Sequence, residues 1–215
     1  ESALDQSVSV DRDLSPLRKN YYSWREPYET PGSVKMEQIV LQLNEVLAED
    51  AIVANGAGNY AAWLHRYFQY KSFKTQLAPT SGSMGYGIPA AISAKLERPN
   101  TEVVCLAGDG CAQMSIQEFG TAVQYKANII IIISNNGVYG TIKMHQERTY
   151  PGRTSGTNML NPDFASLARS YGGFGETVEK TAEFLPAFER ARSAGKPAII
   201  ELKTNPLALS PQTPA

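Results

Sequence analysis

An isolated carboxylate, Asp109, is the side chain of this sequence best suited to chemistry. It is the only charged residue within 103–117, and an uncharged stretch at 127–142 carries the amides Asn135 and Asn136. A carboxylate between apolar segments needs a partner, and Mg²⁺ takes one or two carboxylates, neutral oxygens and phosphate oxygens. The two segments together predict a magnesium–diphosphate site, whereas either one alone is equally typical of an ordinary turn.

The elements that must position these residues alternate between strands and helices. Apolar runs of strand length lie at 51–54, 103–107, 128–134, 175–178 and 197–202. Helical patterns lie at 36–47, 60–68, 89–96, 115–125, 161–171 and 181–194. This alternation predicts an α/β domain with a doubly wound, mainly parallel sheet and helices on both faces. Ligands of such sheets bind at the carboxyl ends of the strands, where Asp109 and Asn136 are expected.

Two helix starts are predicted from local sequence. Ser33 precedes the first helical pattern and is expected to be its N-cap. Ser115 and Glu118 fit a capping box that opens the helix at 115–125. The N–H groups at the start of that helix are expected to face the diphosphate.

The composition and the proline-bearing ends of the chain indicate the extent of the domain and the class of protein. The chain has 215 residues, and polar, proline-bearing ends at 1–32 and 205–215 predict a linker or arm and a C-terminal tail around one domain at 33–204. A net charge of −1 gives no electrostatic footprint for nucleic acid or an anionic membrane. Two cysteines and two isolated histidines predict neither a disulfide scaffold nor a zinc site. No stretch has the length and apolarity of a membrane span. Both cysteines are interpreted as packed free thiols in a reducing compartment, so we expect a cytoplasmic protein.

A family resemblance rests on two motifs. Gly108-Asp109-Gly110, followed after 24 residues by Asn135-Asn136, resembles the motif with which thiamine-diphosphate enzymes bind their cofactor. The segment 81–91 resembles the corresponding stretch of acetolactate synthases, and the similarity covers about 33–204. The chain is therefore expected to be the diphosphate- and magnesium-binding domain of an acetolactate-synthase-like enzyme.

The resemblance implies a role for each matching residue. Asp109, the Asn136 side chain and the Val138 carbonyl are the expected magnesium ligands. Met84 is expected to support the bent cofactor, and the Gly82 carbonyl and Met84 amide to hold its pyrimidine ring. The other expected cofactor contacts are Ala57, Gly58, Asn59, Gly108, Gly110, Cys111 and Tyr139.

The resemblance also implies partners and a substrate class. A pyrimidine-binding domain of another subunit supplies a glutamate in such enzymes, and no segment of this chain matches it. We therefore expect an incomplete enzyme that forms a homo-oligomer and acts on a 2-oxo acid by carboligation or decarboxylation. His145 stands where acetolactate synthases carry a tryptophan, so the outcome of the reaction stays open. The loop at 148–156 is either a lid or a passive surface loop.

Two other functions compete with this prediction. Gly56 to Ala61 fits the dinucleotide fingerprint G-x-G-x-x-A, but no Asp or Glu lies between Asn59 and Leu96 to bind a ribose. The second alternative is a non-catalytic module that binds the same cofactor or mediates assembly. Magnesium-dependent binding of thiamine diphosphate would distinguish the predicted function from a dinucleotide-dependent enzyme. Turnover would distinguish it from a non-catalytic module.

Overall fold

The computed structural model describes residues 13–211, and six parallel strands form its centre. The strands are β1 (Ile52–Asn55), β2 (Gln76–Leu77), β3 (Val103–Gly108), β4 (Ile130–Asn135), β5 (Phe174–Val178) and β6 (Ala198–Lys203). Their order across the sheet is β2-β1-β3-β4-β6-β5. The chain runs from β1 to the edge strand β2 and then crosses to the other side of β1, where β3, β4, β6 and β5 lie, so the predicted doubly wound α/β fold is confirmed.

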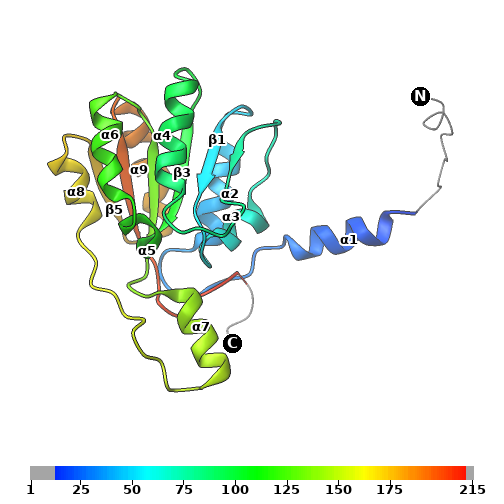
Figure 1. Ribbon diagram of the computed structural model, residues 1–215. Coiled ribbons are helices and arrows are strands. Elements are labelled where there is room, and N and C mark those ends of the chain that lie inside the picture. Colours follow the sequence, from blue (N-terminus) through cyan, green and yellow to red (C-terminus); the bar gives the residue numbers. More distant parts are fainter. Residues whose placement is uncertain (1–12, 212–215) are drawn as a thin grey trace, which may run out of the picture.

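Helices cover both faces of this sheet (Figure 1). One face packs against α2 (Met36–Val46), α3 (Ala61–Tyr67) and α9 (Phe184–Ser193). The other packs against α4 (Gly87–Glu97), α6 (Phe119–Gln124) and α8 (Phe164–Ser170). The isoleucines of β4 divide between the two cores because successive side chains of a strand point to opposite faces.

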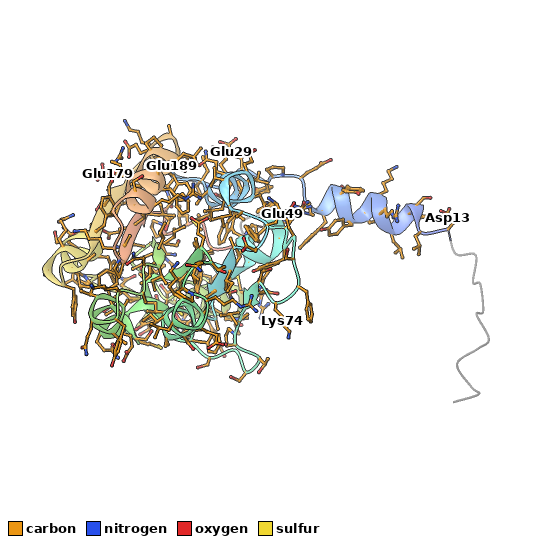
Figure 2. The ribbon with its side chains drawn as sticks, turned by 90° about the horizontal axis from the view of Figure 1, so that it is seen from above. Asp13, Glu29, Glu49, Lys74, Glu179 and Glu189 are labelled. Atoms are coloured by element: carbon orange, nitrogen blue, oxygen red, sulfur yellow. The ribbon has the colours of Figure 1, made fainter. Side chains whose placement is uncertain are left out.

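Two further helices lie outside this sandwich. α1 (Ser15–Trp24) stands away from the domain with no buried residue, and Figure 2 shows it from above with Asp13 at its start. α7 (Gly140–Thr149) follows β4 and lies below the sheet in Figure 1. Neither helix was expected from periodicity, since neither presents an apolar stripe to the core. Within residues 13–211, no helix is both long enough and apolar enough to cross a membrane.

Both predicted helix caps are wrong. The N-cap of α2 is Lys35, and the carbonyl of Ser33 instead accepts hydrogen bonds from the backbone and side chain of Thr181. Ser115 precedes the 3-10 turn at 116–118 but makes no side-chain capping hydrogen bond, because its hydroxyl donates to the Gly85 carbonyl at 2.8 Å. The hydroxyl of Ser115 is thus occupied by a tertiary contact and not by the local capping role that its sequence neighbours favour.

The expected helix at 115–125 is divided into a 3-10 turn and α6, and a separate short helix, α5 (Asp109–Gln113), precedes them. α5 begins directly after β3, the 3-10 turn follows at Ile116–Glu118, and α6 completes the segment. The first turn after β3 is therefore made by Asp109 itself. The expectation that the N–H groups of 115–125 face the site is corrected accordingly: the backbone beside Asp109 belongs to α5.

Candidate functional site

A cleft opens at the carboxyl ends of β1, β3 and β4, next to the first turn of α7. It contains about 590 Å³ of empty space, part of it open to solvent. Eleven of the twelve predicted site residues line it, namely Ala57, Gly58, Asn59, Met84, Gly108, Asp109, Gly110, Cys111, Asn136, Val138 and Tyr139. The fold thus brings together segments that lie more than 80 residues apart.

Gly82 is the predicted residue that does not line this cleft. It is exposed, its φ is +68°, and a Cβ built on it would have no neighbour within 4 Å. The residue two positions on, Met84, is half-buried and lines the cleft. The segment therefore turns at Gly82 and places only its later part at the site.

Asp109 is buried beneath the cleft, with 4% of its surface exposed. Its Oδ1 accepts the N–H of Gly110 at 2.8 Å, and its Oδ2 accepts the N–H of Gly137 at 2.8 Å and the amide of Asn161 at 2.7 Å. Burial raises the pKa of Asp109, and these hydrogen bonds oppose the rise. Each of the three donors is neutral, so the carboxylate is solvated by dipoles and lacks a counter-ion.

The two amides at the end of β4, Asn135 within the strand and Asn136 after it, have different surroundings. Asn135 lies two residues beyond Ile133 on the same face, and its Nδ2 donates to buried Glu201 at 2.6 Å. Asn136 lines the cleft, where its Oδ1 accepts the N–H of Val138 at 3.1 Å. Strand alternation separates the pair, so only the second amide can face a ligand.

A turn at Gly137 holds this loop against Asp109. Gly137 has a φ of +69°, a conformation that favours glycine, and this directs its N–H to the Asp109 carboxylate. Val138 forms an antiparallel bridge with Asn158. The carboxylate, the Asn136 amide and the Val138 backbone consequently border one cleft.

The donor set at this place suits a hard cation. Residues 13–211 contain no group of three or more His, Cys, Asp or Glu side chains that could hold a metal, so a site here must combine the one carboxylate with neutral oxygens. That combination, completed by water and phosphate, is the one Mg²⁺ favours. The residues present therefore fit magnesium bound together with a diphosphate.

The loop at 57–59 forms the opposite wall of the cleft. The backbone N–H of Asn59 donates to the Thr141 hydroxyl at 3.1 Å, and that hydroxyl donates to Asn59 Oδ1 at 2.9 Å. These bonds tie the segment after β1 to the first turn of α7. Thr141 was not expected at the site, because nothing in its own neighbourhood distinguishes it from a surface threonine.

The floor beneath the cleft is close-packed around Cys111. Its sulfur accepts hydrogen bonds from the Tyr60 hydroxyl at 3.2 Å and the Gly85 backbone at 3.1 Å. A Cβ on Gly56 would lie 2.3 Å from this sulfur, and one on Gly108 would lie 2.6 Å from the Tyr60 ring. Burial raises the pKa of Tyr60, with the thiol beside it adding to the rise. Glycine is therefore required at both strand ends for packing.

Comparison with known proteins identifies the family. Residues 56–202 match the family described as thiamine pyrophosphate enzyme, C-terminal TPP binding domain. The chain belongs to this family. It is 36% identical over 196 residues to the acetolactate synthase large subunit of Haemophilus influenzae and 34% identical over 188 residues to that of Cyanidium caldarium. These alignments cover 88% and 84% of this chain but only 34% and 32% of the relatives.

A solved structure gives the same result for the fold. The chain is similar to the thiamine diphosphate-dependent 4-hydroxybenzoylformate decarboxylase of Rhodococcus jostii RHA1, with a TM-score of 0.77 and 32% sequence identity. The match covers 84% of this chain and 34% of that one. This thiamine pyrophosphate-binding domain thus spans about a third of the length of the relatives it matches.

The C-terminal tail of the domain reaches the cleft. Ala208 and Leu209 line it, and Arg66 donates to the Pro211 carbonyl at 2.6 Å. Arg66 also donates to the Trp24 carbonyl at 2.6 Å, so one side chain holds both terminal segments. Sequence analysis missed this part of the site because a polar, proline-rich tail carries no periodic signal.

His145 and the loop after it lie away from the cleft lining. The His145 ring lies 2.9 Å from the Arg148 guanidinium through Nδ1. Two hydrogen bonds between Gln146 and Ser155 hold the loop against α7. The residues of α7 that line the cleft are instead Gly140, Thr141 and Ile142.

Proposed function

We propose that the cleft binds thiamine diphosphate through Mg²⁺ held by Asp109, the Asn136 side-chain oxygen and the Val138 carbonyl. The observation that carries the proposal is the state of Asp109, a buried carboxylate at a strand end with neutral donors around it. A divalent cation provides the positive charge that those donors lack.

Contacts to the diphosphate and to the rest of the cofactor are assigned by position. Gly108, Gly110, Cys111 and Tyr139 border the cation site, and the loop from Ala57 to Asn59 faces them across the cleft. Met84 supports the cofactor, and its amide holds the pyrimidine edge together with the carbonyl of Gly82, a residue outside the cleft lining. When bound, thiamine diphosphate supplies a nucleophilic carbon and the electron sink that bond cleavage beside a 2-oxo carbonyl requires. The chain's part is to bind and orient it.

The complete activity needs more than this domain. We propose that a pyrimidine-binding domain of another subunit closes the cleft, that the assembly is a homo-oligomer in the cytoplasm, and that it acts on a 2-oxo acid. The relatives include acetolactate synthases and a decarboxylase, which supports carboligation or decarboxylation. The match to about a third of each relative is consistent with a domain that works beside others.

Calorimetry tests the cofactor assignment. Thiamine diphosphate is titrated into the intact protein that carries this domain, with Mg²⁺ and then with a chelator, and NAD serves as the control ligand. The proposal expects saturable heat with thiamine diphosphate only when Mg²⁺ is present, and none with NAD. Heat that is independent of Mg²⁺, or heat with NAD, contradicts it. Release of carbon dioxide from 2-oxo acids then distinguishes an enzyme from a non-catalytic cofactor-binding module.

A further inference from the structure

Asn161 has one side-chain nitrogen that reaches two residues of the site region. Its Nδ2 donates to Asp109 Oδ2 at 2.7 Å and to Asn135 Oδ1 at 2.7 Å. A primary amide carries two N–H donors, so both are used. Its Oδ1 accepts a hydrogen bond from Gln113 Nε2 at 2.6 Å. The Asn161 side chain is therefore held on three sides.

A relay of hydrogen bonds from Glu201 through Asn135 fixes the orientation of the Asn161 amide. Glu201 is a carboxylate, so Asn135 must direct its NH₂ group to it and its oxygen away from it. That oxygen in turn requires a donor from Asn161. Lys203 anchors the relay, because its ammonium contacts the same Glu201 oxygen at 2.6 Å. If the Asn161 amide were flipped, its oxygen would face two other acceptors, Asp109 Oδ2 and Asn135 Oδ1.

The backbone places Asn161 next to the loop after β4. Met159 N–H donates to the Gly137 carbonyl at 2.8 Å, and Tyr139 N–H donates to the Thr157 carbonyl at 2.8 Å. These two bonds join 157–159 to 137–139 in the manner of a short antiparallel pair. Asn161 follows this pairing directly, so its distance from Asp109 is set by main-chain contacts.

We propose that Asn161 is a positioning residue for the magnesium ligand Asp109. With Gly137 N–H, it occupies both lone pairs of Oδ2, which leaves Oδ1 as the oxygen that faces the cation. Asp109 thus binds Mg²⁺ through one oxygen, with the carboxylate plane fixed before the metal arrives. This inference rests on the proposed function, since it concerns the same cation site.

Removal of the Asn161 amide tests the proposal through metal affinity. Asn161→Leu keeps the approximate size of the side chain and deletes both donors. Mg²⁺ is titrated into the intact protein at saturating thiamine diphosphate, and the Kd for Mg²⁺ should rise roughly 10–100-fold, the usual effect of losing an outer partner of a metal ligand. The matched control is Asn128→Leu, which deletes an exposed amide bond to the Gly195 carbonyl at the opposite end of β4. Its Kd should match the wild type.

A second measurement separates positioning from a merely structural role. With Mn²⁺ in place of Mg²⁺ and all sites filled, the electron paramagnetic resonance spectrum should be broader in Asn161→Leu than in the wild type. Superimposable spectra at saturation, or an unchanged Kd, overturn the proposal. If Asn161→Leu does not fold, Gln113→Leu decides: it deletes an exposed donor to Asn161, and a Kd at least twofold weaker supports the proposal while an unchanged Kd overturns it.

The wild type distinguishes this proposal from the one on which it rests. If the wild type does not bind thiamine diphosphate in a magnesium-dependent manner, both the proposed function and this inference are wrong. Magnesium-dependent binding in the wild type, with the same Kd in Asn161→Leu, removes only the role of Asn161.

Discussion

Two buried carboxylates, Asp109 directly after β3 and Glu201 within β6, have different partners for their charge. Glu201 lies in β6 with no exposed surface, and Lys203 of the same strand face contacts it directly. Asn135 and Thr177 provide two more hydrogen bonds at 2.6 and 3.2 Å. Asp109 has a similar number of hydrogen bonds, but no ion pair joins it to any Lys, Arg or His within residues 13–211.

The difference indicates what each carboxylate is for. A buried charge is tolerated when it is paired and hydrogen-bonded, and Glu201 meets both conditions inside the fold. Asp109 meets the second only, at a place that borders a cleft. Glu201 therefore belongs to the structure of the sheet, whereas we propose that a bound cation completes Asp109. The predictions below test that division.

The largest effect is expected for Asp109→Ala. Loss of an outer partner of a metal ligand typically lowers affinity 10–100-fold, so loss of the ligand itself should weaken magnesium-dependent binding of thiamine diphosphate by more than about 100-fold. Calorimetry of the intact protein measures this. An affinity equal to the wild type would remove Asp109 from the cation site and end the contrast with Glu201.

Glu201→Ala should act on stability more than on binding. Asn135 and Thr177 lose a buried acceptor, so the free energy of unfolding should fall by about 2 kcal/mol, as measured by chemical denaturation. The control is Glu176→Ala, which breaks an exposed ion pair with Arg190 and should change stability by less than about 1 kcal/mol. A Glu201 variant that loses magnesium-dependent binding as completely as Asp109→Ala, at wild-type stability, would contradict the assigned roles.

Met84→Ala should separate turnover from affinity. The side chain lines the cleft, where it is proposed to orient the cofactor rather than to hold its charge. Loss of orientation should lower kcat about tenfold or more, while the Kd for thiamine diphosphate stays within about threefold of the wild type. Wild-type turnover in this variant would refute the proposed orienting role.

The smallest effect is expected for Thr141→Val. This change removes the neutral hydrogen bonds between the α7 turn and Asn59, and such bonds contribute about 1 kcal/mol each. The Kd for thiamine diphosphate should rise about two- to fivefold by calorimetry. A loss as large as that of Asp109→Ala would show that the wall of the cleft, and not the buried charge, dominates binding.

Much of the fold followed from local patterns. The strands at 103–107 and 128–134 and the helices at 60–68 and 89–96 were predicted because burial on both faces and helical periodicity leave a direct trace in sequence. The two-residue strand β2, the short α5 and the helix α7 were missed. Each is too short or too exposed for periodicity, and contacts with the rest of the chain determine its conformation.

The residue types of the site can be read from the sequence: one carboxylate in an uncharged stretch, glycines beside it and an amide at the end of the next strand. Which of their atoms meet depends on the fold. It directs Asn135 inward to Glu201 and Asn136 to the cleft, leaves Gly82 outside, and brings in Thr141, Asn161 and Leu209. The physical reason is that side-chain type is a local property, whereas a hydrogen bond requires two groups within about 3 Å, and the packing of the sheet, helices and tail sets those distances.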